Sequence, residues 1–449
     1  MTDQSSAQPV RAAVIGAGAF GTAIVTQSAA APLVDVCVAV DERPQNALQA
    51  FRQAGFENEE IAECDSRQAA VAALEAGKRV VLEAPLLAVE LPVEVIVEAT
   101  GAAEAGARHA REAIRHGRHV VMVNKEADAV VGRILKHRAD REGVSYLPAD
   151  GDQHGLLIGL VAWARELGLE VICGGKARVG EFVLDKTDGC LSVAGVRIPP
   201  DKERFFSFIR SGKAREFVTE RAEVLREVGG VSNGDMEEMA IAANATGLMP
   251  EGELMHQPVL RTREIPEALC TARDGGILRS SGAIETITCL RRAEEAGLGG
   301  GVFVVVSSDN EYSRRFLTGK AHVANAAGTA TLIARPYHLC GVETPTSILA
   351  AAGRRPSPTA PEVRPRVDVV ARTVQALAKG ERVTADVVRT EMHPARRVGP
   401  RSPLPFRMAL GAAAKTEVPP GTLLTCDMIE EPADSALWEL RGEQDARFL

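Results

Sequence analysis

Charged side chains follow apolar runs of this sequence, in places where they could do chemistry. Lys125 comes two residues after the apolar run 119–123, and Asp150 and Asp152 lie at the end of a further run. An ammonium in such a place can polarise a carbonyl or move a proton, whereas paired carboxylates can hold a hard cation or a hydroxyl. We therefore expect Lys125 to be catalytic and the two acids to bind a substrate hydroxyl or a metal. A turn that caps the next helix is the alternative for the acids.

A glycine-rich turn stands near the N-terminus, between an apolar run and a helical stretch. Its first glycine permits a sharp turn, its second lets the backbone approach a pyrophosphate, and its third lets helix and strand pack closely. The start of the helix offers free N–H groups to phosphates. Because strand, turn, helix and second strand follow in the required order, the pattern predicts a dinucleotide-binding site. We expect the site to include Gly16, Gly18, Ala19, Phe20 and Gly21.

The choice between NAD and NADP depends on two residues that follow the second strand. Asp41 would accept hydrogen bonds from a ribose 2′-hydroxyl and repel a 2′-phosphate, whereas Arg43 could pair with that phosphate. The sequence therefore leaves NAD and NADP as alternatives. Neighbouring strand ends add three further cofactor-binding candidates, namely Thr100, Gly101 and Asn124.

These residues need an alternating framework to position them. Strand-like runs at 34–40, 93–98 and 119–123 alternate with alanine-rich helical patterns, which predicts an α/β fold with a doubly wound parallel sheet over residues 1–150. Ligands of such sheets bind at the carboxyl ends of the strands. We expect an α+β catalytic and oligomerisation domain over 151–360. A linker rich in Pro and Arg then leads to a small β-rich domain over 361–449.

Composition narrows the class of protein. The chain has 449 residues, 45% of them apolar and 25% charged, which is typical of a soluble globular protein. Its net charge of -8 disfavours binding to nucleic acid or an acidic membrane, and no apolar run approaches the roughly 20 residues of a membrane span. The eight cysteines stand singly, without a zinc or disulfide pattern. We expect a cytoplasmic protein that binds neither nucleic acid nor membranes.

Several motifs together carry a resemblance to a known family. They are VIGAGAFG, VNKEAD, LPADGDQHG, AIAANATGL, ARPYHL, KGERVTADVV and PPGTLLTCDMI. With these motifs the chain resembles the homoserine-dehydrogenase-like oxidoreductases that end in a SAF domain, a group that includes deoxyxylulose-phosphate-reductoisomerase-like enzymes. The resemblance implies an N-terminal Rossmann domain for NAD(P), a central catalytic domain, a SAF-like C-terminal domain and a homo-oligomer.

Two of these motifs, NKEAD and LPADGDQ, are also similar to segments of ordinary deoxyxylulose-phosphate reductoisomerase. The similarity implies that Lys125 lies near cofactor and substrate and that Asp150 and Asp152 bind Mg²⁺. Relatives also carry a lysine in an Asp-Gly-Ser/Thr-Lys stretch, where this chain reads VSNG at 231–234. Either Lys176 or Lys186 is then expected to replace that lysine, or the chemistry has changed.

The helical run 235–248 offers the remaining candidates. Glu238 and Asn244 could face a ligand, and Glu237 or Glu238 could supply a third metal carboxylate. We expect an NAD(P)-dependent oxidoreductase that acts on a small hydroxy-carbonyl substrate, with or without a phosphate and with or without coupled isomerisation. A homoserine dehydrogenase reaction is one alternative. A sensor or scaffold that binds the nucleotide without turnover is another.

Overall fold

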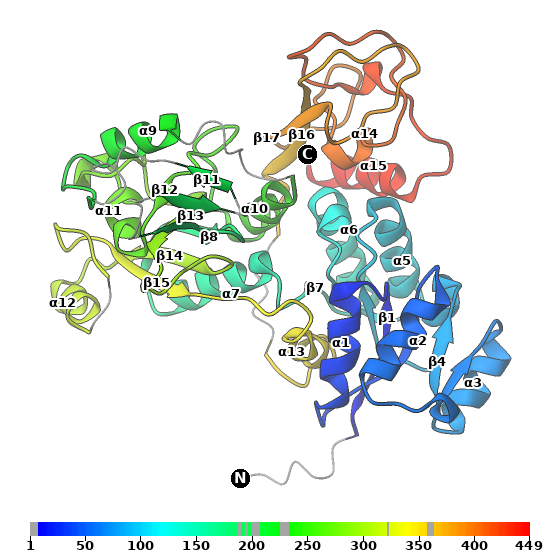
Figure 1. Cartoon of the computed structure of the whole chain (residues 1–449). Helices are drawn as coiled ribbons and strands as arrows, with labels where there is room; N and C mark the ends of the chain where they lie inside the picture. The colour runs from blue at the N-terminus through cyan, green and yellow to red at the C-terminus, as the bar shows by residue number, and fades with distance from the viewer. Residues whose placement is uncertain are drawn as a thin grey trace.

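The computed structural model places the chain in three regions. The N-terminal region, blue to cyan, lies beside the green central region, and the orange and red C-terminal region lies above them (Figure 1). The described residues are 8–185, 190–193, 196–198, 207–224, 233–320, 323–356 and 363–449. Among these residues, no helix combines the length and the apolar character needed to pass through a bilayer.

The N-terminal region is built on a seven-stranded parallel sheet. Its strands, in spatial order, are β3 (Ile61–Glu63), β4 (Arg79–Leu82), β2 (Val34–Val40), β1 (Val10–Ile15), β5 (Val95–Glu98), β6 (His119–Met122) and β7 (Tyr146–Pro148). The strand order reverses between β1 and β5, which is where such sheets bind ligands. The expected α/β class and doubly wound sheet are confirmed.

Helices cover both faces of this sheet. They are α1 (Ala19–Ala29), α2 (Pro44–Gln53), α3 (Arg67–Glu75), α4 (Pro85–Val89), α5 (Ala103–Arg115) and α6 (Lys125–Glu142). Along β1, Ala12 and Val14 are buried in one apolar cluster, whereas Ala13 and Ile15 are buried in another. Since successive strand side chains point to opposite faces, this central strand has two cores to fill and carries an unbroken apolar run.

The central region holds a mixed sheet in which β13 (Ala283–Arg292) runs parallel to β8 (Glu170–Ala177) and β14 (Val302–Ser307) runs antiparallel to it. The other strands are β9 (Phe182–Leu184), β10 (Leu191–Val193), β11 (Val196–Ile198), β12 (Val259–Leu260) and β15 (Thr331–Arg335). The principal helices are α7 (Gln153–Glu166), α9 (Ala214–Val224), α10 (Asn233–Thr246) and α12 (Glu311–Gly319), and α11 (Ile265–Ala268) is a single turn. This mixture of strands and helices agrees with the expected α+β character.

The chain returns to the first sheet before it enters the C-terminal region. Helix α13 (Thr344–Ala351) lies beside α1 (Figure 1), and its Ile348 and Ala351 are buried in the core on one face of that sheet. The segment that joins the central sheet to α13 therefore passes the carboxyl ends of the N-terminal strands, where a ligand is expected.

The C-terminal region contains the antiparallel pair β16 (Val367–Thr373) and β17 (Val388–Pro394), the short helix α14 (Phe406–Ala409) and the terminal helix α15 (Ala436–Phe448). Loops joined by single β-bridges make up most of the remainder. Helix α15 packs against α5 and α6 of the N-terminal region (Figure 1). The last segment of the chain is thus fixed to the elements that follow β5 and β6.

Candidate active site

The glycine turn has the geometry of a phosphate-binding site. Gly16 has a φ of 98°, and a Cβ on it would lie 2.7 Å from the Ala99 carbonyl oxygen. A Cβ on Gly21 would lie 1.9 Å from the oxygen of Gly16, so the close approach of α1 to the turn requires this glycine. Gly18 differs, because a Cβ there would meet nothing within 4 Å. Two of the glycines serve protein packing, and the third faces open space.

That space lies at the start of α1. Gly18 is the N-cap residue and offers no side chain to cap the helix. The first N–H groups of a helix lack partners within the helix, and an anion can satisfy them. The backbone at Ala19 and Phe20 therefore offers N–H groups where the sequence predicts a pyrophosphate, and their binding of the cofactor stays a prediction.

Asp41 is held beside this turn. Its carboxylate accepts a hydrogen bond from the backbone N–H of Ala17 at 2.9 Å, and its other oxygen accepts from the N–H of Arg43 and from Asn46. The Arg43 side chain is exposed at the start of α2. The two residues that bear on NAD or NADP thus lie together, with the acid fixed against the turn.

Thr100 and Asn124, from adjacent strand ends, contact each other. The Asn124 amide donates to Thr100 Oγ1 at 3.1 Å and to the Ala102 carbonyl at 2.9 Å, and its oxygen caps α6 through the N–H of Ala127. Gly101, with a φ of 70°, lies between the two bonded positions of this loop. Because the polar groups of Asn124 are used within the protein, its contribution is to fix the loop at the β5 end.

Lys125, the first residue of α6, lies in a cluster of opposite charges. Its Nζ is 2.7 Å from Glu238 Oε1 and 3.9 Å from Asp152 Oδ2. Lys176, from β8, contacts the second oxygen of Glu238 and lies 2.7 Å from Asp235 Oδ1. The structure thus brings four of the predicted catalytic residues together from two regions of the molecule.

Exposure separates the two lysines. The side chain of Lys125 is 25% exposed, whereas that of Lys176 is 2% exposed. Burial alone would lower the pKa of each, but the neighbouring carboxylates, Glu238 first, outweigh it and raise both. Both lysines are therefore held as ammonium ions. Lys125 can reach a substrate, and Lys176 lies behind it as a counter-charge for Glu238.

Asp152 carries the negative charge on the other side of Lys125. Burial would raise the pKa of its carboxyl, but His154, Lys125 and Lys176 hold it below its usual value. It also accepts a hydrogen bond from the N–H of Gln153 at the start of α7. The capping alternative and the catalytic expectation for Asp152 are compatible, because one oxygen caps the helix while the other faces the ammonium.

Asp150 has a different environment from Asp152. Its carboxylate accepts from Thr346 Oγ1 at 2.9 Å, and its backbone N–H donates to Ser347 Oγ at 2.7 Å. Asp150 thereby joins β7 to α13, whereas Asp152 faces Lys125. A Mg²⁺ ion between the two acids would have to compete with these hydroxyl and ammonium partners, so the donor set does not fit a metal well. The metal expectation stays a prediction.

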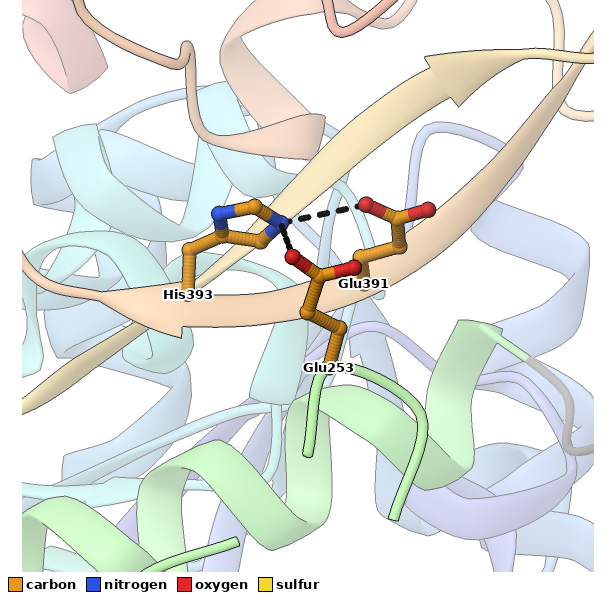
Figure 2. Close-up of side chains that lie close together, drawn as sticks. All are labelled: Glu253, Glu391 and His393. Carbon is orange, nitrogen blue, oxygen red and sulfur yellow. Dashed lines mark hydrogen bonds and ion pairs between the residues drawn. The ribbon is translucent and has the colours of Figure 1, made fainter. Parts of the chain in front are cut away.

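One other group of side chains could chelate a cation among the described residues. Glu253, Glu391 and His393 lie close together where the central region meets β17 (Figure 2). Glu391, however, is already paired with Arg372 through both oxygens, at 2.7 and 2.9 Å, and with Arg389 at 3.0 Å. Two guanidinium groups on one carboxylate oppose the binding of a further cation, so we interpret this cluster as a junction between regions.

Three sequence candidates have other outcomes. Lys186 lies outside the described residues. Asn244 accepts from the backbone N–H groups of Arg366 and Val367 and donates to the Val367 carbonyl, so it anchors the start of the C-terminal region. Glu237, proposed as a third metal ligand, binds Arg407 instead.

Sequence reasoning missed two residues of the site. Asp235 lies three positions before Glu238 in α10, and residues with this spacing share a helix face, which is a signal that could have identified it. Cys340 lies in the loop between β15 and α13. Burial and Asp152 raise the pKa of its thiol, and Lys125 opposes them. The pKa of this thiol therefore depends on the charges of the cluster. Nothing in the local sequence marks that proximity.

The loop that carries Cys340 covers both halves of the site. A Cβ on Gly341 would lie 2.6 Å from the Phe20 carbonyl of the glycine turn. On the other side, a Cβ on Gly151 would lie 2.7 Å from the Leu339 carbonyl. This loop therefore packs against the cofactor turn and against the segment that bears Asp152, and it joins the two into one site.

Comparisons with known proteins agree with this architecture. Residues 16–148 match the family model for the NAD-binding domain of homoserine dehydrogenase, and residues 216–344 match that for the catalytic domain of oxidoreductase DRL. No curated protein matches the chain in sequence.

Several solved structures match part of the chain. GenD2 from gentamicin A biosynthesis, in complex with NAD, is 23% identical with a TM-score of 0.27, and the match covers 40% of this chain and 46% of that one. Biliverdin reductase from Synechocystis sp. PCC 6803 is 15% identical, with a TM-score of 0.26 and coverage of 40% and 49%. Myo-inositol dehydrogenase from Lactobacillus casei is 12% identical, with a TM-score of 0.29 and coverage of 39% and 47%. The chain thus spans about half the length of these structures.

Proposed function

We propose that this NAD(P)-dependent oxidoreductase interconverts a hydroxyl and a carbonyl group on a small substrate. Its homoserine-dehydrogenase-type NAD-binding domain and its DRL-type catalytic domain support this proposal. In it, Lys125 is the group that contacts the reacting oxygen. The observation that carries the proposal is the partly exposed ammonium of Lys125, held by Glu238 and Asp152 at the carboxyl end of β6. Ligands of parallel sheets bind at this edge.

The chemistry divides between the cofactor and the chain. The nicotinamide cofactor supplies or accepts a hydride when it is bound. In the direction of reduction, the Lys125 ammonium donates a hydrogen bond to the substrate oxygen and stabilises the alkoxide that forms, and solvent supplies the proton that completes the hydroxyl. In the direction of oxidation, the hydroxyl proton passes to solvent while the same ammonium stabilises the alkoxide. The raised pKa of Lys125 makes it an effective electrostatic partner for a developing alkoxide.

The carboxylates have two roles in this proposal. Asp152 and Glu238 keep Lys125 protonated and limit the rotamers it can adopt, so the ammonium is aimed before substrate arrives. The oxygen of Asp152 that faces Lys125 can also accept a hydrogen bond from a second hydroxyl of the substrate. A hydroxy-carbonyl compound, with or without a phosphate, has the groups that this arrangement recognises.

We propose NAD as the preferred cofactor. Next to Asp41, at the carboxyl ends of β2, β3 and β4, lies a pocket of about 690 Å³. Its charged lining residues are Glu42, Glu63, Asp65 and Glu83. The 2′-phosphate of NADP would bring about two negative charges toward five carboxylates, and the exposed Arg43 would offset these only in part. A free 2′-hydroxyl meets no such repulsion.

The remaining expectations stay proposals. We assign residues 1–150 to cofactor binding, 151–360 to catalysis and oligomerisation and 361–449 to a SAF-like domain, and we propose a homo-oligomer. The return of α13 to the first sheet supports a close union of the first two parts. A reaction without rearrangement is favoured over a metal-assisted reductoisomerase reaction, because Asp150 and Asp152 have separate partners.

Purified protein tests these proposals. NADH and NADPH binding is followed by fluorescence, and nicotinamide absorbance is then followed with aspartate semialdehyde, deoxyxylulose phosphate and a panel of hydroxy-carbonyl compounds, each with and without EDTA. We expect NADH to bind at least about tenfold more tightly and turnover to be insensitive to EDTA. Tight cofactor binding without turnover across the panel would favour a sensor. Loss of turnover in EDTA would restore the metal-assisted reaction.

A further inference from the structure

Arg407 extends from the C-terminal region toward the lysine cluster. It lies in α14, and its guanidinium contacts Glu237 through Nε at 2.5 Å and through Nη2 at 2.8 Å. The same Nη2 lies 3.5 Å from Glu126 Oε1. A guanidinium that binds one carboxylate through two nitrogens is fixed in orientation as well as in distance. Arg407 therefore joins α14 to α6 and α10 with defined geometry.

Both acids that Arg407 contacts are sequence neighbours of the catalytic cluster. Glu126 follows Lys125 at the start of α6, and Glu237 precedes Glu238 in α10. The two helices are thus joined by two adjacent ionic bridges, one from Lys125 to Glu238 and one through Arg407. On both helices, the residues of the second bridge are the direct sequence neighbours of the residues of the first.

The charges of the two bridges also act on each other. Burial raises the pKa of Glu237, while Arg407 and Lys125 oppose that effect. Glu126 is one of the carboxylates that raise the pKa of Lys125. Without Arg407, Glu126 would attract the Lys125 ammonium in competition with Glu238, and Glu237 would do so in the fraction of molecules in which it stays ionised. Arg407 neutralises these competitors and leaves the ammonium with Glu238 and Asp152.

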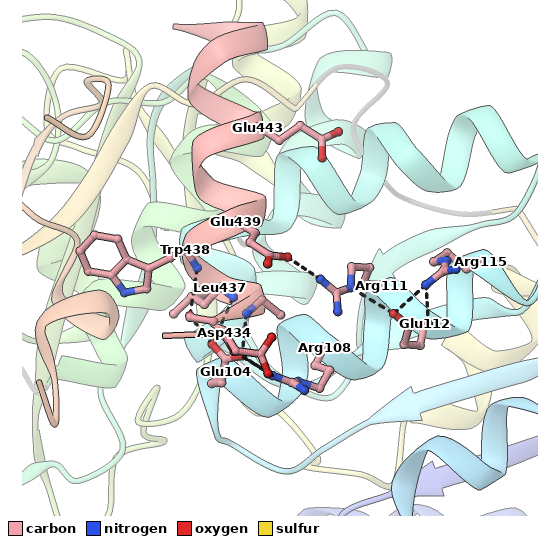
Figure 3. A network of polar contacts seen from close by, with 12 residues as sticks. Glu104, Arg108, Arg111, Glu112, Arg115, Asp434, Leu437, Trp438, Glu439 and Glu443 are labelled. Carbon is pink, nitrogen blue, oxygen red and sulfur yellow. Dashed lines mark hydrogen bonds and ion pairs between the residues drawn. The ribbon is translucent and has the colours of Figure 1, made fainter. Parts of the chain in front are cut away.

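The C-terminal region is anchored firmly enough for this role. Glu104 of α5 accepts hydrogen bonds from Ser435 Oγ and from the N–H groups of Ala436 and Leu437 at the start of α15, and Arg111 contacts Glu439 at 2.9 Å (Figure 3). These bonds combine a charge-assisted helix cap with an ionic contact.

A second anchor lies at the other end of the region. His393 Nε2 lies 3.6 Å from Glu253 Oε1 (Figure 2), and the Met392 N–H donates to the Glu253 carbonyl at 2.7 Å. The two anchors attach the C-terminal region, which contains α14, to both neighbouring regions.

We propose that Arg407 is a positioning residue through which the C-terminal region completes the active site, by holding Glu126 and Glu237 away from Lys125 so that the ammonium stays directed at substrate. The inference rests on the role proposed above for Lys125. It gives the C-terminal region a part in the reaction that does not require contact with substrate.

Three variants and a matched control test it. Arg407→Met removes the charge, Arg407→Lys keeps the charge but not the paired contact, and Arg407→Met with Glu237→Gln removes both the cation and its strongest partner. Arg372→Met is the control, because Arg372 makes the same kind of two-nitrogen contact to a buried glutamate, Glu391, in the same region but outside the lysine cluster.

Turnover is the first measurement. We expect kcat to fall about tenfold in Arg407→Met with little change in cofactor affinity, to be partly retained in Arg407→Lys, and to recover to within about threefold of wild type in the double variant. Arg372→Met is expected to keep kcat. Wild-type kcat in Arg407→Met, or no recovery in a folded double variant, would overturn the inference.

The alkylation rate of Cys340 by iodoacetamide, followed by peptide mass spectrometry at fixed pH, is a second measurement that needs no substrate. Cys340 is an exposed residue; partial burial of its thiol and Asp152 raise the thiol pKa, and Lys125 lowers it. If the ammonium turns toward Glu126 and Glu237, the thiolate becomes rarer. We expect a rate about two- to threefold lower in Arg407→Met, restored in the double variant and unchanged in Arg372→Met.

The two measurements separate the two ideas. Absence of turnover in wild type, together with the expected Cys340 rates, would refute the proposed reaction while upholding the role of Arg407. Normal turnover that is lost in Lys125→Met, together with unchanged kcat and Cys340 rates in Arg407→Met, would refute the role of Arg407 alone.

Discussion

The glycine turn and the lysine cluster reach their function by opposite routes. The turn is one short segment, in which Gly16 and Gly21 permit close packing while Gly18 leaves a space open for a ligand. The cluster is assembled from β8, α10 and the starts of α6 and α7. Its lysines and the carboxylates that they contact therefore lie far apart in the sequence. The comparison teaches that a site formed by one short segment depends on backbone shape. A site assembled from segments far apart in the sequence depends on charge balance between separate elements.

The largest expected effect is the loss of the buried counter-charge in the cluster. Lys176→Met removes the buried cation that lies between Glu238 and Asp235, and it leaves Glu238 with Lys125 alone and Asp235 with Arg178 at 3.6 Å. Breaking a buried ion pair by removing one partner costs about 3 to 5 kcal/mol, so the free energy of unfolding in urea should fall by that amount. An unchanged unfolding midpoint would show that the cluster does not depend on this charge.

Lys125→Met sharpens the contrast within the cluster. Because Lys125 is partly exposed and Lys176 still neutralises Glu238, we expect turnover to fall about a hundredfold or more while stability changes little. NADH affinity should stay near the wild-type value, since the glycine turn is untouched. Steady-state kinetics and fluorescence titration measure the two quantities. Near-normal turnover would remove Lys125 from the reaction.

A packing change in the turn should have a smaller effect on stability. A Cβ at Gly21 would lie 1.9 Å from the Gly16 oxygen, so Gly21→Ala forces α1 away from the turn. Overpacking of this kind costs about 1 to 3 kcal/mol. Thermal unfolding should show the loss, with weakened NADH binding. A variant as stable as wild type would contradict the packing role of this glycine.

The smallest effect concerns the charge of Asp152. Its pKa is held below the value of an unfolded aspartate, so the carboxylate contributes stability that is present above about pH 4 and is lost as the pH falls through its folded value. Asp152→Asn keeps a side chain that can cap α7 and removes the charge. We expect it to be less stable than wild type by about 1 kcal/mol at pH 7, with a difference that shrinks as the pH falls below about 4. A constant difference would assign the effect to packing.

The sequence reveals the turn and the framework because both are recorded in neighbouring residues. The order of strand, three glycines, helix and acid at Asp41 requires no long-range information. Lys125 and Asp152 could be predicted because each follows a strand, and strand ends meet at one edge of a parallel sheet. Glu238 was one of two adjacent acids, and only the structure separates its contact with two lysines from the contact between Glu237 and Arg407.

The other members of the site could not be found in this way. Cys340 comes near the cluster only because the chain leaves the central sheet and returns to the first one through α13. Arg407 comes near it because α15 docks on α5 and α6, about 300 residues further along the chain. Such contacts arise from the packing of whole regions, which a local pattern of residues does not encode.

Gly18→Asp tests the central claim most directly, because this glycine faces ligand space and not protein. A Cβ there meets nothing within 4 Å, and an aspartate at an N-cap stabilises a helix, so the variant should unfold at the wild-type temperature or slightly above. Its carboxylate would occupy the N–H groups of α1 and repel the pyrophosphate. In a fluorescence titration with NADH, we predict saturable binding by wild type and an affinity about a hundredfold or more lower in the variant. Equal affinity in the two proteins would contradict the claim that this turn binds the cofactor.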